Sequence, residues 1–210
     1  MSLVSTKWLF NNRENVKIID CSWHLPNEKR NSLEEYNSEH IPNAIYFDID
    51  KNSDQNSDLP HMLPSKKEWE KIVSSLGISN DDKIIIYDNS DLISSCRLWY
   101  SFLYFGHNKE LVYILNGGLE KWNKEKLVTT NKKTDLVKTN YRAIENNEMV
   151  KNLDEIKVNI EEKKFKLVDA RSIDRFQGRI AEPREGLRSG SIKNSICLPF
   201  KEVINKDKTF

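Results

Sequence analysis

The stretch VKIIDCS, residues 16–22, has a close counterpart later in the chain in FKLVDAR, residues 165–171. Each is a short apolar run that includes or ends near an Asp, which is typical of a buried strand in a parallel sheet. Downstream, SEHIPNAIYF at 38–47 is echoed by SGSIKNSICLPF at 189–200. Because the matched segments follow one another at nearly the same spacing, the sequence predicts a duplicated α/β unit whose second copy is incomplete.

The 210-residue chain has 38% hydrophobic and 31% charged residues, an ordinary composition for a globular protein. Its 33 basic and 32 acidic residues are spread along the chain, which argues against nucleic-acid binding, since that needs a clustered basic face. No apolar run approaches the roughly twenty residues that span a bilayer, so no membrane association is expected. The start lacks a secretory signal, and the three widely spaced cysteines suit neither a disulfide framework nor a metal site. We therefore expect a reducing compartment, the cytoplasm.

Strand and helix patterns alternate after the first repeat segment. Ser65 followed by Glu68 predicts a capping box at the start of a helix, and Gly77 marks its end. KIIIYD at 83–88 is the clearest buried strand, and an aromatic-rich helix is expected over 94–105. This alternation predicts a parallel sheet covered by helices on both faces.

The polar residues 131–140, rich in Lys and Thr, are interpreted as a linker between a first domain, 1–130, and a partial second domain, 141–210. In open parallel sheets, ligands bind beyond the carboxyl ends of the strands. The strand at 83–88 delivers Asp88 to that edge, before a helix N-terminus whose converging N–H groups favour an anion. A carboxylate there repels an anion, so the first domain is predicted to be a non-catalytic copy.

Short motifs occur in order along the chain: Asp20 with Ser22-Trp23, Tyr36 with His40-Ile41-Pro42, His61-Met62-Leu63-Pro64-Ser65, Gly117-Gly118-Leu119, Asp169-Ala170-Arg171-Ser172 and Glu182-Pro183-Arg184. Together they resemble the two-domain rhodanese family, and more specifically its 3-mercaptopyruvate sulfurtransferase branch. The resemblance implies an α/β fold of tandem rhodanese-like domains, each a parallel sheet flanked by helices, with the second incomplete in this chain.

The resemblance also implies a chemistry. In such enzymes a cysteine takes sulfur from a small anionic donor, 3-mercaptopyruvate or thiosulfate, as a persulfide. It passes the sulfur to a thiol or cyanide acceptor, which includes thioredoxin-like proteins, and no metal or organic cofactor is implied. The family's cysteine lies in a glycine- and serine-bearing loop late in the second domain. The repeat spacing puts that loop past Phe210, so the chain as given is expected to be inactive.

Four residues match site positions of the family. Arg175 and Arg184 match its substrate-binding arginines, whose guanidinium forks supply paired charge-assisted hydrogen bonds to a donor carboxylate. Asp50 and His61 match positions that support catalysis by orienting a serine of the cysteine loop. Each has a structural alternative: a local ion pair for Arg175, an exposed loop cation for Arg184, packing for His61 and a turn for Asp50.

Several features weigh on this interpretation. Cys21 at a strand end, Cys96 in an aromatic helix and Cys197 in an apolar strand lack the loop that activates a thiol, so all three are expected to be packing residues. Asn43 stands where the family has Gly, which requires a left-handed backbone conformation. A non-catalytic rhodanese-like binding module is the alternative function, and a phosphatase of related fold is a weaker third.

Overall fold

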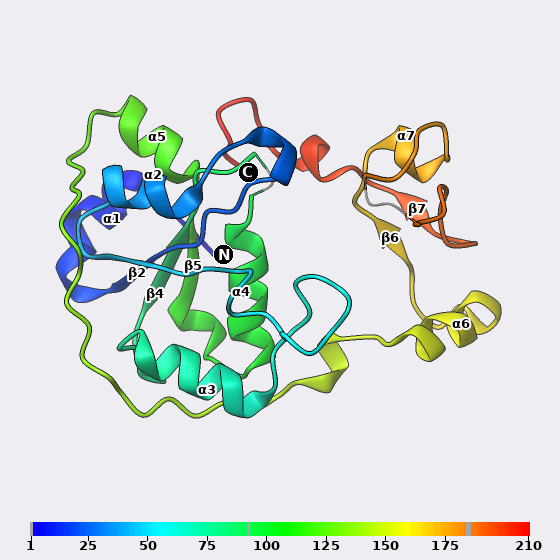
Figure 1. The fold of residues 1–210 in the computed structure, drawn as a ribbon, viewed down its shortest axis with the longest axis horizontal. Coiled ribbons are helices and arrows are strands. Elements are labelled where there is room, and N and C mark those ends of the chain that lie inside the picture. The colour runs from blue at the N-terminus through cyan, green and yellow to red at the C-terminus, as the bar shows by residue number, and fades with distance from the viewer. Residues whose placement is uncertain (1, 92, 184–185) are drawn as a thin grey trace. The chain divides into compact units, whose positions relative to one another are not determined.

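The computed structural model describes residues 2–91, 93–183 and 186–210 (Figure 1). The chain divides into two compact units, Met1–Asn147 and Glu148–Phe210. This division falls later than the linker expected at 131–140. The reason is that Tyr141 and Ala143 are buried in the hydrophobic core of the first unit.

A five-stranded parallel sheet forms the centre of the first unit, with strand order β1-β5-β4-β2-β3 (Figure 1). The strands are β1 Leu3–Val4, β2 Lys17–Asp20, β3 Ala44–Tyr46, β4 Ile84–Tyr87 and β5 Val112–Leu115. In the central register, Ile19 of β2 lies between Ile45 of β3 and Ile86 of β4. All residues of β4 are buried, as its continuous apolar sequence predicts.

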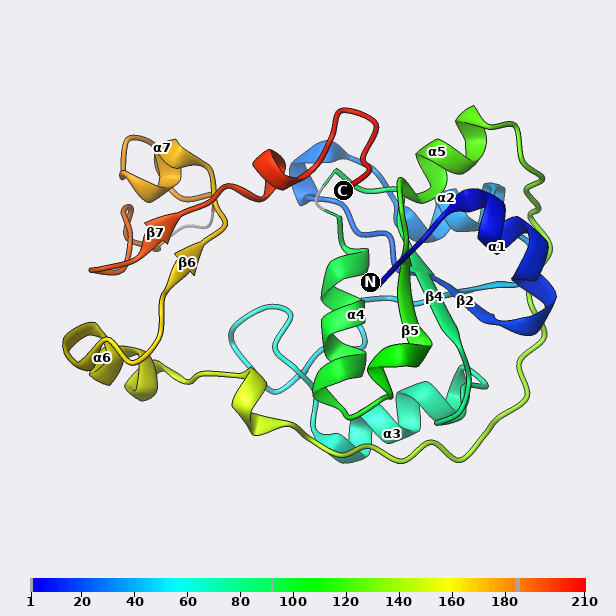
Figure 2. The same cartoon turned by 180° about the vertical axis from the view of Figure 1, so that it is seen from behind.

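Helices cover both faces of this sheet (Figures 1 and 2). The helices are α1 Thr6–Asn12, α2 Ser32–Ser38, α3 Lys66–Ser75, α4 Ser95–Tyr104 and α5 Gly118–Lys124, with short 3-10 turns η1 Arg13–Asn15, η2 Pro26–Glu28 and η3 Lys109–Leu111. Side chains alternate along β4, so Ile84 and Ile86 pack with α3 and α4, whereas Ile85 and Tyr87 pack with α1, α2 and α5. The predicted two-sided covering of a parallel sheet is confirmed.

The start and end of α3 follow the sequence signals. The Ser65 backbone N–H donates to Glu68 Oε2 at 2.9 Å, and the Glu68 N–H donates back to Ser65 Oγ at 3.4 Å. This reciprocal pair satisfies two N–H groups that the first helical turn leaves unpaired. Gly77 then takes a left-handed φ of 70°, which ends the helix as predicted.

The second unit contains a short parallel strand pair, β6 Val168–Asp169 with β7 Ile196–Cys197. Its helices are α6 Leu153–Glu162 and α7 Ile173–Phe176, the 3-10 turn η5 Phe200–Val203 follows β7, and the 3-10 turn η4 Asn147–Met149 spans the boundary between the units. The residues Val168 and Ile196 are 55% and 54% exposed, whereas the matching Ile19 and Ile45 of the first unit are almost fully buried. The strand pair β6–β7 therefore has the same parallel pairing as β2–β3, but it lacks the layer of helices that buries the first pair.

The two repeat segments share their turn geometry. The Ser22 N–H donates to Asp20 Oδ1 at 2.9 Å, and the Arg171 N–H donates to Asp169 Oδ1 at the same distance. The left-handed conformation required of Asn43 is observed, with φ of 69°. Asn194, at the matching position of the second segment, has φ of 68°. The same backbone turn is therefore built twice by segments of different sequence.

Candidate functional site

Asp88 occupies the helix N-terminus that the fold offers to an anion. It follows β4 and is 4% exposed. Its Oδ2 accepts the Ser95 N–H at 2.6 Å, and its Oδ1 accepts the Ser90 N–H at 3.4 Å. Burial raises the pKa of Asp88 above its usual range. The N–H donors that hold an external anion in other α/β proteins are here taken by a carboxylate of the chain itself.

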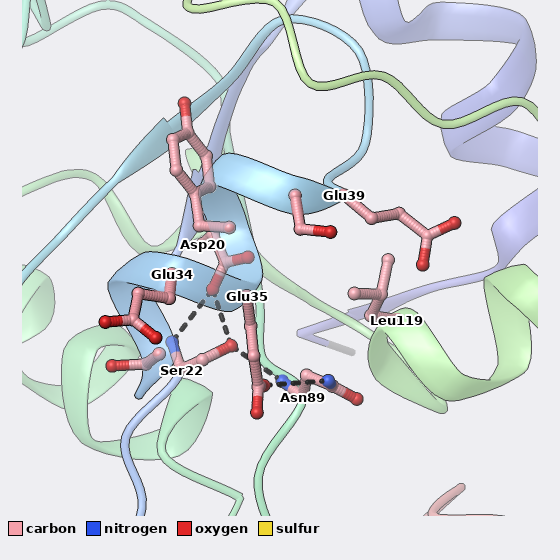
Figure 3. Close-up of a pocket in the computed structure, with 10 residues that line it drawn as sticks. Asp20, Ser22, Glu34, Glu35, Glu39, Asn89 and Leu119 are labelled. Atoms are coloured by element: carbon pink, nitrogen blue, oxygen red, sulfur yellow. Dashed lines mark hydrogen bonds between the residues drawn. The ribbon is translucent and has the colours of Figure 1, made fainter. Parts of the chain in front are cut away.

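A pocket of about 340 Å³ lies at the same edge of the sheet (Figure 3). Asp20 lines it, with Oδ1 accepting the Ser22 N–H at 2.9 Å and the Ser22 hydroxyl at 2.6 Å. Burial raises the pKa of Asp20 to about 6. Three glutamates complete the acidic lining: Glu34, Glu35 and Glu39. This lining repels a small anion, so the first unit's own strand edge does not suit a mercaptopyruvate or thiosulfate donor.

Asp50 and His61, both candidates from the sequence, are in direct contact. His61 Nε2 lies 2.7 Å from Asp50 Oδ1, and the other carboxylate oxygen accepts the Trp23 indole N–H at 2.9 Å. The imidazole stands edge-on to the Trp23 ring, with centroids 4.8 Å apart. The Asp50 side chain is 63% exposed and that of His61 is 22% exposed, so solvent reaches both. A neutral imidazole that donates from Nε2 presents Nδ1 as its acceptor.

Two partners of this pair were not singled out from the sequence. Trp23 is part of a family motif in the sequence, which does not mark it as a partner of Asp50. Its indole N–H is a hydrogen-bond donor that needs an acceptor, and Asp50 supplies one. Arg97 donates from Nη2 to the backbone carbonyl of His61. The sequence signal for Arg97 is that it is the single charged residue of the aromatic-rich helix α4.

Arg175 lies in the second unit, where it is held by a carboxylate. Its Nη2 donates to Glu182 Oε2 at 2.5 Å, and its Nε lies 3.4 Å from Oε1. Arg171 Nη1 donates to the same Oε1 at 2.7 Å. The Arg175 hydrogen bond is the main cause that lowers the pKa of Glu182. The local ion pair foreseen for Arg175 is therefore present, while Arg184 lies outside the described residues.

The sequence candidates thus fall into two groups, with Asp50 and His61 in the first unit and Arg175 in the second. Glu182 belongs to a sequence motif, but nothing in the sequence marks it as the partner of two arginines. Its position seven residues after Arg175, in a loop rather than on a helix face, offered no periodic signal.

The environments of the cysteines disfavour a reactive thiol. Burial raises the pKa of Cys21 well above its usual range, and it raises the pKa of Cys96 to about 11. Burial and nearby carboxylates also raise the pKa of Cys197. A nucleophilic thiol needs a lowered pKa, so none of the three has suitable surroundings.

Neither a metal centre nor a membrane-spanning helix is found in the described part of the chain. No cluster of three or more His, Cys, Asp or Glu side chains among residues 2–91, 93–183 and 186–210 is arranged to bind a metal ion. In the same ranges, every helix is too short or too polar to cross a bilayer.

Comparison with known proteins gives consistent matches. A model of the rhodanese-like domain matches residues 5–125. The mitochondrial thiosulfate/3-mercaptopyruvate sulfurtransferase 1 of Arabidopsis thaliana is 37% identical over 99% of this chain and 60% of its own length. The 3-mercaptopyruvate sulfurtransferase of Mus musculus is 35% identical over 98% of this chain and 71% of its own length.

A solved structure matches as well. The crystal structure of SseA from Escherichia coli, a 3-mercaptopyruvate sulfotransferase by its description, is 30% identical with a TM-score of 0.89. The match covers all of this chain and 79% of that one. The chain therefore spans between 60% and 79% of the lengths of these three similar proteins.

Proposed function

Because this chain belongs to the rhodanese-like domain family, we propose that it is the greater part of a sulfurtransferase that uses 3-mercaptopyruvate or thiosulfate. The acceptor of the sulfur is a thiol, as in a thioredoxin-like protein, or cyanide. The observation that carries the proposal is the 2.7 Å contact between His61 Nε2 and Asp50 Oδ1 in a solvent-accessible loop. A carboxylate-oriented imidazole at such a place is suited to moving a proton.

The proposed reaction needs a proton when the donor is cleaved. A cysteine thiolate attacks the sulfur of 3-mercaptopyruvate, an S–S bond forms, and the C–S bond breaks with its electron pair left on carbon as the pyruvate enolate. That enolate takes up a proton, which the S–H group of the donor gives up as its sulfur becomes the outer sulfur of the persulfide, and pyruvate results. Asp50 and His61 are proposed to supply this proton path by orienting a serine hydroxyl of the cysteine loop, and Arg175 to bind the donor carboxylate. An acceptor thiolate then attacks the outer sulfur and releases the cysteine.

The nucleophile is proposed to lie outside residues 1–210, which leaves the isolated chain inactive. This follows from the raised pKa values of Cys21, Cys96 and Cys197, each of which is the reverse of what a sulfur carrier needs. Incubating the isolated chain with either donor should therefore leave all three thiols without an added sulfur in intact-mass measurements. A protein that also includes the cysteine loop should gain one sulfur and release pyruvate from 3-mercaptopyruvate.

The second candidate, a non-catalytic rhodanese-like binding module, is favoured by one observation. In the first unit, Asp88 takes the N–H donors at the α4 N-terminus, and acidic side chains line the adjacent pocket. The same mass measurement separates the two candidates. A protein with the cysteine loop that gains no sulfur from either donor would exclude the sulfurtransferase and leave the module.

A further inference from the structure

His61 has a backbone conformation that is costly for a residue with a side chain. Its φ is 57°, in the left-handed region. It follows a long loop of turns and bends after β3, in which Leu59 is 60% exposed. The buried apolar residues of the loop, Phe47 and Ile49, lie at its β3 end, and no residue between Asp50 and His61 is buried, so contacts from outside the loop must help to hold His61.

Helix α4 supplies one such contact. Arg97, in its first turn, donates from Nη2 to the carbonyl oxygen of His61, 36 positions earlier in the sequence. The helix itself is anchored, because Leu98 and Phe102 are almost fully buried in the core. The Arg97 hydrogen bond therefore ties the His61 backbone to a rigid element.

Trp23 supplies the second contact, from the segment after β2. Its ring is half-buried and packs against the core cluster that contains Leu98. The indole N–H donates to Asp50 Oδ2, and the imidazole of His61 stands at 88° to the indole plane. Trp23 thus restrains both the carboxylate and the ring that the carboxylate orients.

We propose that Arg97 and Trp23 are positioning residues, which hold the imidazole of His61 with Nε2 on Asp50 and Nδ1 available for proton transfer. The proposal rests on the proposed function, because it concerns the residues that orient the pair assigned to proton transfer. Arg97 acts through the backbone carbonyl and Trp23 acts through the carboxylate and the ring face. Neither side chain needs to touch the sulfur donor.

Carbon-13 relaxation of the imidazole ring tests this on the chain as it exists. In the unaltered chain we expect an order parameter near that of rigid backbone, roughly 0.85, and in Arg97→Gln a value below about 0.6. Trp23→Phe, which keeps a ring but loses the N–H, should also lower the value. Arg97→Lys keeps a cationic donor and should restore part of the order.

Arg13→Gln is the matched control, because Arg13 also donates from a guanidinium to a backbone carbonyl, that of Phe10, away from this loop. Its His61 ring should stay as ordered as in the unaltered chain. A mobile His61 ring in the unaltered chain, an unchanged ring in Arg97→Gln, or an equal loss in Arg13→Gln would each overturn the proposal. If amide spectra show that Arg97→Gln does not fold, the order parameters of the His61 ring in Trp23→Phe and Arg97→Lys test the proposal instead. An unchanged ring in Trp23→Phe would then overturn it.

A kinetic measurement separates this inference from the proposed function. In the protein that includes the cysteine loop, Arg97→Gln should lower kcat for 3-mercaptopyruvate with little change in KM, because it leaves donor binding intact. Absence of sulfur transfer by the unaltered protein would remove the proposed function but not the ring-order result. Unchanged kcat in Arg97→Gln would remove the positioning role while sulfur transfer stands.

Discussion

Arg175 and Glu182 form an ion pair in which Nη2 lies 2.5 Å from Oε2, and the Glu182 side chain is only 4% exposed. The carboxylate meets the guanidinium side-on, through Nε and Nη2. The end-on pair of N–H groups on Nη1 and Nη2 keeps the fork geometry that suits a second carboxylate. A pre-oriented guanidinium loses less side-chain freedom on binding an anion than a mobile one does.

Replacing Arg175 by Ala should weaken the binding of 3-mercaptopyruvate. Loss of hydrogen bonds to a charged group costs about 1.5–3 kcal/mol, so we expect KM to rise roughly ten- to a hundredfold with the fold retained. Steady-state kinetics of the protein that includes the cysteine loop measure this. Arg179→Ala is the control, because Arg179 is an exposed cation paired with Asp174. Unaltered kinetics in Arg175→Ala would remove Arg175 from the site.

Replacing Glu182 by Gln should change the acid response of the second unit. The pKa of Glu182 is lowered in the folded chain, so its stabilising effect is present above its unfolded pKa and is lost as pH falls through the folded value. The protection factors of the amides in β6 and β7, which are exchange rates corrected for their intrinsic pH dependence, should fall on acidification of the unaltered chain, and less so in Glu182→Gln. Identical pH dependence in the two proteins would contradict a stabilising role of this carboxylate.

Replacing Asp20 by Asn should stabilise the first unit at neutral pH. Burial raises the pKa of Asp20 to about 6, so the folded chain retains a proton that the unfolded chain releases from about pH 4 upward. The Asp20 contribution to stability therefore falls as pH rises from about 4 to about 6 and then levels off. Since Asn Oδ1 can accept the same bonds from Ser22, we expect a gain of up to about 3 kcal/mol at neutral pH.

Urea unfolding at several pH values checks the Asp20 prediction. Asp54→Asn is the matched control, because Asp54 is less buried and also accepts a turn hydrogen bond, from the Asn56 N–H. That control should show no comparable gain. A pH profile of Asp20→Asn parallel to that of the unaltered chain would refute the prediction.

Replacing Asp88 by Ala should destabilise the first unit. The change leaves the buried N–H groups of Ser90 and Ser95 without their acceptor, at a cost of about 1–3 kcal/mol each when no water enters. Asp88→Asn keeps one acceptor oxygen and should lose less. The free energy of unfolding of the two variants measures the difference, and equal values would show that the carboxylate is not needed as an acceptor.

Local signals in the sequence were sufficient for several elements. The apolar run of β4, the capping box at Ser65, the glycine stop at Gly77 and the left-handed turn at Asn43 each depend on residues adjacent in the chain. Their outcomes follow from backbone sterics and short-range hydrogen bonds, which the surrounding fold does not change. Local signals were not sufficient for the C-terminal boundary of the first unit, because Tyr141 is buried by residues far away in sequence, including His107.

The same contrast between local and long-range effects applies to the candidate site. By itself the sequence determined the α/β class, the repeated strand-and-turn segments, the family, and the candidates Asp50, His61 and Arg175. Only the tertiary structure decided the partners: Trp23 on Asp50 from 27 positions away, Arg97 on His61 from 36, and Glu182 across a loop from Arg175. The reason is that such contacts depend on how irregular loops cross rigid elements, and loop paths carry no periodic pattern from which they can be read.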